Sequence, residues 1–72
     1  MTAIDLILAL SDPTRLRIAR LLAQEGPLCV CELCAALAAD QPKVSRHLAR
    51  LRDAGLVRDA RIAQWAVYAL AP

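Results

Sequence analysis

Residues Gln41 to Val57 read QPKVSRHLARLRDAGLV, and they contain the most regular hydrophobic pattern in this 72-residue chain. Asp40, just before them, can cap a helix, and Pro42 suits a first helical turn, where a backbone N–H has no intrahelical partner. Apolar residues then recur at the spacing of one helical face, at Val44, Leu48 and Leu51. Gly55 follows where a left-handed residue would end a helix. The segment therefore predicts a helix from about Pro42 to Asp53.

The opposite face of this predicted helix is basic. At about 100° per residue, four side chains fall within about a third of a turn, namely Lys43, Arg46, His47 and Arg50. Six basic and two acidic residues give residues 41–61 a net charge of +4, although the whole chain carries only +2. Such a segment in a nearly neutral protein is typical of a nucleic-acid contact, although a solvated helix face would show the same pattern.

Two more helices are predicted upstream. Thr2 to Leu10 has apolar residues at helical spacing and no helix breaker. A second helix follows at once, because Ser11 or Asp12 can cap it and Gly26 stops it before Pro27. We expect its buried stripe to consist of Leu16, Ala19, Leu22 and Ala23.

The remaining segments complete a recognisable order of elements. Leu28 to Ala39 has a third helical pattern, and Leu56 to Leu70 has the alternation of two short strands joined near Arg61 to Ala63. This turn lacks the Gly or Asn of a tight hairpin, and the regularly spaced alanines that follow would also suit a helix. The order predicts a mainly α protein with a small β-hairpin, a winged helix-turn-helix.

Four segments resemble the ArsR/SmtB family of bacterial metal-sensing repressors. They are Leu10–Leu22 (LSDPTRLRIARLL), Leu28–Cys34 (LCVCELC), Gln41–Val57 and Trp65–Leu70 (WAVYAL), and together they cover nearly the whole chain in order. The resemblance implies a homodimeric repressor that binds double-stranded operator DNA with an inverted repeat. The CVCELC element is similar to that of the arsenic-responsive branch, whereas cadmium and lead sensors usually have further cysteines near the N-terminus.

Members of this family continue past the wing into another helix, which packs with the first helix in the dimer. This chain ends at Pro72. We therefore expect a single winged helix-turn-helix domain over residues 1–72 without the C-terminal dimerisation helix. Either the chain is truncated or it dimerises through less surface.

Three closely spaced cysteines form the candidate metal site, namely Cys29, Cys31 and Cys34. An odd number at this spacing makes a poor disulfide framework and suggests free thiols in a reducing compartment. Thiolates select soft ions, and structural zinc usually takes four ligands, so three thiols suit a three-coordinate ion. The count and the resemblance together predict trivalent arsenic or antimony as the inducer, with no organic cofactor.

The spacing of these cysteines also suggests how the inducer acts. On a regular helix Cys31 and Cys34 share a face, but Cys29 points about 200° away from Cys31. We therefore expect metalloid binding to unwind the first turn of the third helix, or to trap it unwound, and so displace the basic helix from DNA. A position near a helix N-terminus is also expected to lower the pKa of these thiols.

The predicted DNA contacts follow from the motif. The second helix of a helix-turn-helix enters the major groove with its N-terminal residues nearest the bases. We predict that the base edges are contacted by Gln41, Ser45, Arg46 and His47, although His47 alone would also suit a structural role. We predict that the DNA phosphates are contacted by Lys43 and Arg50 on the helix and by Arg58 and Arg61 on the wing, with Gln64 as a weaker candidate.

Two alternatives to this function stay open. One is a winged-helix regulator that responds to cadmium, lead or thiol oxidation. The other is a thiol-dependent reductase using Cys31 and Cys34, but such a motif is expected beside a strand in a βαβ unit, so we predict that the protein is not an enzyme. No apolar run approaches the roughly 18 residues of a membrane span, and the start lacks a secretory signal pattern, which predicts a cytoplasmic protein with no membrane partner.

Overall fold

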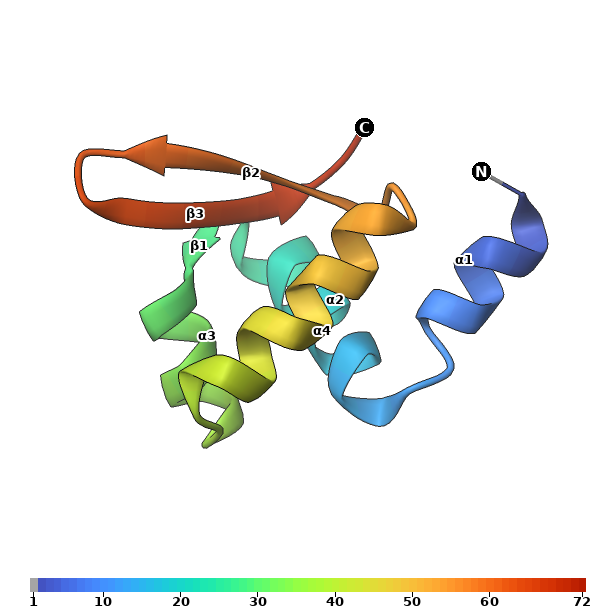
Figure 1. The fold of residues 1–72 in the computed structure, drawn as a ribbon, viewed down its shortest axis with the longest axis horizontal. Coiled ribbons are helices and arrows are strands. Elements are labelled where there is room, and N and C mark those ends of the chain that lie inside the picture. The colour runs from blue at the N-terminus through green and yellow to red at the C-terminus, as the bar shows by residue number, and fades with distance from the viewer. Residues whose placement is uncertain (1) are drawn as a thin grey trace.

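The computed structural model describes residues 2–72 and shows helices packed beneath a small antiparallel sheet (Figure 1). The elements are α1 (Ala3–Ala9), α2 (Pro13–Glu25), β1 (Leu28–Cys29), α3 (Val30–Leu37), α4 (Gln41–Asp53), β2 (Val57–Ile62) and β3 (Trp65–Leu70). The strand order is β1-β3-β2, so that β3 lies in the middle of the sheet. This arrangement is a winged helix-turn-helix, in which α3 and α4 form the motif and the β2–β3 hairpin forms the wing.

The stripe predicted on α4 forms the centre of the core. Val44, Leu48 and Leu51 each have 0% of their surface exposed. Ile18 of α2 and Leu33 of α3 are equally buried, and Val57 at the start of β2 closes the cluster. Burying an aliphatic side chain of this size contributes about 1.5 to 3 kcal/mol, so these contacts hold α2, α3 and α4 together.

The predicted starts of α2 and α4 are confirmed by their caps, and of the two residues that could cap α2 it is Asp12 that does so. The Asp12 carboxylate accepts hydrogen bonds from the backbone N–H groups of Thr14 (2.8 Å) and Arg15 (3.1 Å) at the start of α2. Asp40 caps α4 in the same way, accepting from the Lys43 N–H at 2.9 Å. After α4, Gly55 takes a φ of +81°, in the left-handed region where a side chain would be strained.

The buried face of α2 differs from the predicted one. Ile18 is fully buried, whereas Leu16 is 44% exposed and Ala23 is also exposed. Of the predicted stripe, Leu22 is buried and Ala19 is half-buried. The helix has large apolar residues on more than one side, so periodicity allows several stripes, and packing against α3 and α4 selects the one through Ile18.

The third predicted helix begins later than expected, because its first two residues belong to the sheet. Leu28 pairs with Tyr68 and Cys29 with Val67, both on β3. A strand of two residues has no periodicity of its own, and its hydrogen-bond partners lie about forty positions later in the sequence. The helical pattern of the segment therefore gave no sign of the strand, which forms only because it pairs with β3.

The wing is a hairpin, so the alternative of a helix over this segment is wrong. Ile62 pairs with Trp65, which leaves Ala63 and Gln64 as the turn, one to two residues later than predicted. Ala63 takes a φ of +54°. A two-residue hairpin turn favours Gly or Asn at positive φ, so this alanine is held there by the pairing of the strands on either side.

Helix α1 lies apart from the other helices, as Figure 1 shows. Ala9 is its buried residue, and Ile4, Ile7 and Leu8 are 67%, 66% and 57% exposed. Within residues 2–72, no helix combines the length and the apolar character needed to cross a membrane.

Candidate DNA interface and cysteine pocket

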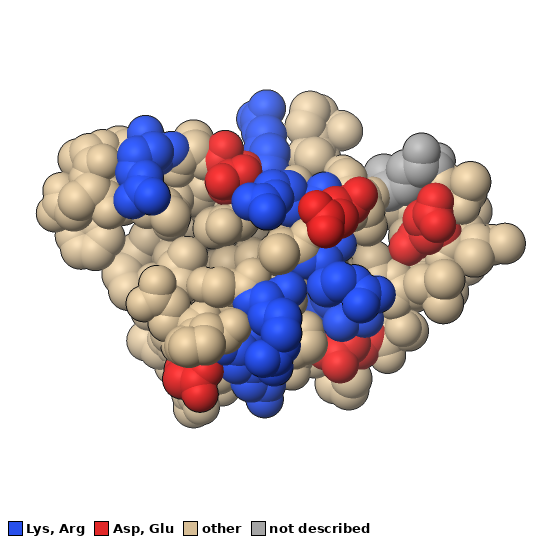
Figure 2. Space-filling view, viewed as in Figure 1, with Lys and Arg blue, Asp and Glu red and all other residues tan. Residues whose placement is uncertain are grey.

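The basic side chains of α4 are exposed on one face of the molecule. Figure 2 shows them as a band over α4, with further basic side chains over the wing. Gln41, Lys43, Arg46 and Arg50 are exposed, and Ser45 is half-buried. Because Val44, Leu48 and Leu51 fix the opposite face in the core, rotation of α4 cannot remove these groups from the surface.

The wing carries the other two predicted arginines. Arg58 and Arg61 both lie on β2 and are exposed. The Arg61 guanidinium donates to the Gln64 carbonyl (3.3 Å), across the turn. An ion pair between Arg52 of α4 and Asp59 of β2 (3.6 Å) joins the wing to the helix, although exposed pairs of this kind contribute little energy.

His47 differs from the other predicted contacts because its ring is turned toward the protein. Its side chain is 14% exposed, and its Nδ1 lies 3.4 Å from Nη1 of Arg15 and 3.8 Å from the Asp12 carboxylate. Burial is the main reason that the pKa of His47 lies below its ordinary value, and nearby cations lower it further against the opposing effect of Asp12. The ring is therefore neutral at neutral pH.

Two of the three cysteines lie side by side. Cys29 is the extended residue just before α3, Cys31 lies in its first turn, and their Sγ atoms are 2.6 Å apart. The Glu32 carboxylate accepts from the Cys29 N–H at 2.9 Å and so fixes this turn. The expectation that Cys29 points away from Cys31 on a helix is wrong, because Cys29 is not helical. These two thiols meet without any unwinding of α3.

The third cysteine is placed differently. Cys34 is half-buried and packs against the hydrophobic core, one turn further along α3. In the part of the chain that the structure describes, no three Cys, His, Asp or Glu side chains are grouped so that they could hold a metal ion. The fold therefore brings together two of the three predicted ligands.

A cavity of about 270 Å³ opens beside the thiol pair, between α3 and the wing. Its lining residues are Cys29, Cys31, Glu32, Ile62, Trp65 and Val67. A second cavity of about 290 Å³ is also lined by both cysteines and Trp65, and it extends to Gln41 of α4 and Arg61 of the wing. We call these two spaces the cysteine pocket. Sequence reasoning missed Trp65, because only the pairing of β1 with β3 brings the wing to the cysteines.

The expected lowering of the thiol pKa is not found at Cys29. Its pKa is raised above the ordinary value, chiefly because of the hydrogen bond between its Sγ and that of Cys31. Such a bond between two thiols needs a proton, so it stabilises the neutral form.

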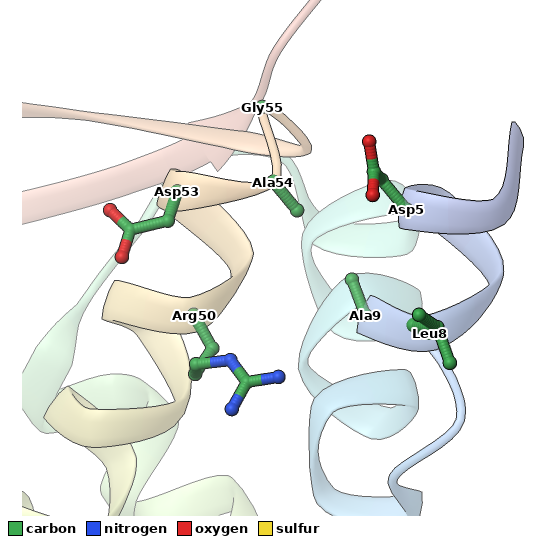
Figure 3. Close-up of a pocket in the computed structure, with 7 residues that line it drawn as sticks. All are labelled: Asp5, Leu8, Ala9, Arg50, Asp53, Ala54 and Gly55. Carbon is green, nitrogen blue, oxygen red and sulfur yellow. The ribbon is translucent and has the colours of Figure 1, made fainter. Parts of the chain in front are cut away.

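A further cavity, of about 510 Å³, lies away from the cysteines, between α1 and the C-terminal end of α4. Figure 3 shows Asp5, Leu8 and Ala9 on one side and Arg50, Asp53 and Ala54 on the other, with Arg50 directed toward α1. Arg50 thus lies at the border between this cavity and the basic band.

Two curated relatives resemble the chain closely. It is 57% identical over 63 residues to the arsenic resistance transcriptional regulator ArsR1 of Pseudomonas putida, covering 88% of this chain and 49% of the relative. It is 52% identical over 69 residues to the arsenical resistance operon repressor of Escherichia coli, covering 96% of this chain and 59% of the relative. The chain thus spans about half to three fifths of these proteins, which are transcriptional regulators and not enzymes.

The fold and a family model agree with these relatives. HlyU from Vibrio cholerae superimposes with a TM-score of 0.92 at 37% identity, over 97% of this chain and 75% of that one. Residues 12–59, from the cap of α2 to the middle of β2, match the model of the bacterial regulatory protein, arsR family. On these grounds, the chain belongs to the arsR family of bacterial regulatory proteins.

Proposed function

We propose that this protein is a cytoplasmic transcriptional repressor that binds operator DNA and is released when trivalent arsenic or antimony binds Cys29, Cys31 and Cys34. The observation that carries the proposal is the cysteine pocket, since the thiol pair adjoins both the first residue of α4 and the wing. Family membership and the names of the relatives support a repressor role and a metalloid inducer.

The exposed face of α4 suits the major groove. Gln41, Ser45 and Arg46 would read base edges from its N-terminal half, while Lys43 and Arg50 would hold phosphates. Arg58 and Arg61 would contact the backbone from the wing. A single domain over residues 1–72 would present one such surface, and a homodimer would present two to an inverted repeat, with half-sites about 34 to 36 Å or a multiple apart.

The donor set fits a thiophilic trivalent ion. Thiolates are soft ligands, and the Sγ atoms of Cys29 and Cys31 already lie 2.6 Å apart. Cys34 follows Cys31 at the three-residue spacing that places side chains on one face of a helix. Each thiol would replace one hydroxyl group of arsenous acid and release one water molecule, so that three thiols release three waters and arsenic stays trivalent.

We infer a link between ligand and DNA that runs through the wing and needs no unwinding of α3. Cys29 is paired with Val67 in the sheet, and Trp65 and Arg61 of the wing line the cysteine pocket with Gln41. A change at the two thiols therefore acts directly on the junction of α3, the start of α4 and the wing. Coupling between two sites in proteins is typically about 1 to 3 kcal/mol, or about 5- to 150-fold in affinity.

The test is operator binding measured by fluorescence anisotropy with and without arsenite. We expect arsenite to weaken binding by the parent chain within that range, and Cys29→Ser and Cys31→Ser to bind DNA normally but ignore arsenite. Cys34→Ser tests whether the third thiol is a ligand. Because coupling is reciprocal, equal arsenite affinity with and without operator would refute the model.

Mass spectrometry separates the remaining alternatives. A three-thiol complex adds one arsenic and loses three protons. Loss of two protons without arsenic would instead indicate a disulfide between Cys29 and Cys31, which their proximity allows, and would favour the oxidation-sensing alternative. Preferential retention of cadmium or lead would favour that ion as the inducer.

A further inference from the structure

Arg15 of α2 contacts two other helices, α1 and α4, with one guanidinium group. It lies in the first turn of α2, where its Nε donates to the carbonyl of Ala9 at 2.7 Å and its Nη2 to that of Leu8 at 3.4 Å. Its Nη1 faces Nδ1 of His47 on α4. The last carbonyls of a helix have no intrahelical partners, so Arg15 satisfies the end of α1 while it contacts α4.

Asp12 completes this group. Its carboxylate caps α2, accepting from the Arg15 N–H, and lies 3.8 Å from Nδ1 of His47. Since a guanidinium can only donate, the Arg15 contact makes Nδ1 an acceptor and places the ring proton on Nε2. We call Asp12, Arg15 and His47 the Arg15 bracket.

We propose that the Arg15 bracket sets the position of α4 relative to α1, and that His47 is a positioning residue for the DNA-reading helix instead of a base contact. This proposal rests on the proposed DNA-binding function. It follows from two observations. The His47 side chain is largely buried against Arg15 and Asp12. Helix α1 buries Ala9, while Ile4, Ile7 and Leu8 stay exposed. Arg15 is thus a main attachment of the end of α1, and the same group fixes α4.

Two substitutions at His47 distinguish positioning from base contact. The amide of Asn can place an acceptor near the position of Nδ1, whereas Gln reaches toward the position of Nε2. A positioning role predicts that His47→Asn keeps the operator affinity and that His47→Gln lowers it by about threefold to tenfold, the value of one hydrogen bond. A base contact through Nε2 predicts the reverse order, and that result would overturn the proposal.

Removing the guanidinium gives a second test, with a matched control on the same helix. Arg15→Gln and Arg17→Gln each remove one positive charge, and Arg17 is exposed. We expect Arg15→Gln to lower operator affinity without changing the slope of log K against log salt, and Arg17→Gln to leave the affinity unchanged. A phosphate contact by Arg15 would instead reduce the slope by about 0.9 and would contradict the proposal.

A measurement on the free protein separates this proposal from the proposed function. Nitrogen NMR of the imidazole should show His47 with its proton on Nε2, and Arg15→Gln should shift the Nδ1 signal. If the signal does not move, the bracket is wrong even when DNA binds. If the parent chain fails to bind any operator while the signal does move, the DNA-binding function fails and the bracket stands as a structural contact. Should Arg15→Gln not fold, the His47 pair still decides.

Discussion

On α2, two apolar side chains of similar size differ in how far they are buried. Ile18 and Leu16 are two positions apart and similar in size, yet Ile18 is fully buried and Leu16 is 44% exposed. Only the first removes its whole surface from water, so only the first should carry a large share of the stability.

Ile18→Ala should therefore lower the free energy of unfolding by about 2 to 5 kcal/mol, because it leaves a cavity between α2 and its neighbours. Leu16→Ala is the matched control and should cost less than about 1 kcal/mol. Urea denaturation followed by circular dichroism measures both. Similar losses for the two variants would show that the buried face of α2 is assigned incorrectly.

His47 makes stability depend on pH near neutrality. Its pKa in the folded protein lies below the ordinary value, so the unfolded chain takes up a proton more readily. Stability should therefore fall as the pH drops through about 6.5 toward the folded pKa, and level off below it. The carboxylates with lowered pKa, Asp5, Asp12 and Glu32, lose their contribution only at more acidic pH.

The measurement is the urea midpoint of the parent chain and of His47→Asn between pH 7.5 and 5.5. We expect the midpoint to decrease with pH in the parent and to stay nearly level in the variant. A parent midpoint that rises on acidification would mean that the folded protein stabilises the imidazolium form.

At the scale of elements, the end of each helix is determined by local hydrogen bonds. Helix α4 begins at the Asp40 cap and ends just before Gly55. These boundaries set which residues of α4 lie at its N-terminal end, where Gln41 and the thiol pair line the same cavity.

Asp40→Ala should destabilise the protein by about 1 kcal/mol, because the Lys43 N–H loses its side-chain acceptor. Asp53→Ala, which removes the same charge at the other end of α4, is the control. It should change stability by no more than about 0.5 kcal/mol, since a negative charge is not favoured at a helix C-terminus. Thermal unfolding compares the two, and equal effects would argue against a capping role.

At the scale of the whole molecule, the sheet joins segments that are far apart in the sequence. Pairing of Cys29 with Val67 brings the wing over the start of α3, and the Arg15 bracket joins α1, α2 and α4. The wing is therefore connected to the thiols, and α4 is connected to α1.

The fluorescence of Trp65 reports on the connection between the thiols and the wing, since Trp65 is the only tryptophan in the chain and lines the cysteine pocket. Arsenite should change its fluorescence in the parent chain and not in Cys29→Ser. The fluorescence change should saturate at the molar ratio of arsenic to protein that mass spectrometry finds. Bound arsenic with unchanged emission would show that the ligand does not reach the wing.

Much of the candidate site was predictable from the sequence, because it depends on spacing within single elements. Val44, Leu48 and Leu51 fix the buried face of α4, and the same periodicity places Lys43 and Arg46 at the surface. The inward position of His47 was not predictable in this way, since the residues that face its ring, Asp12 and Arg15, lie at the start of another helix. Periodicity describes one element and contains no information about its neighbours.

The sequence by itself determined the order of the helices and the hairpin, the cap at Asp40 and the basic face of α4, because these follow from interactions within a few residues. Only the tertiary structure decided that Leu28 and Cys29 form a strand, that α2 buries Ile18, and that Trp65 lies beside the thiols. Each of these depends on contacts between distant segments, where the burial of apolar surface and the pairing of strands outweigh weak local preferences.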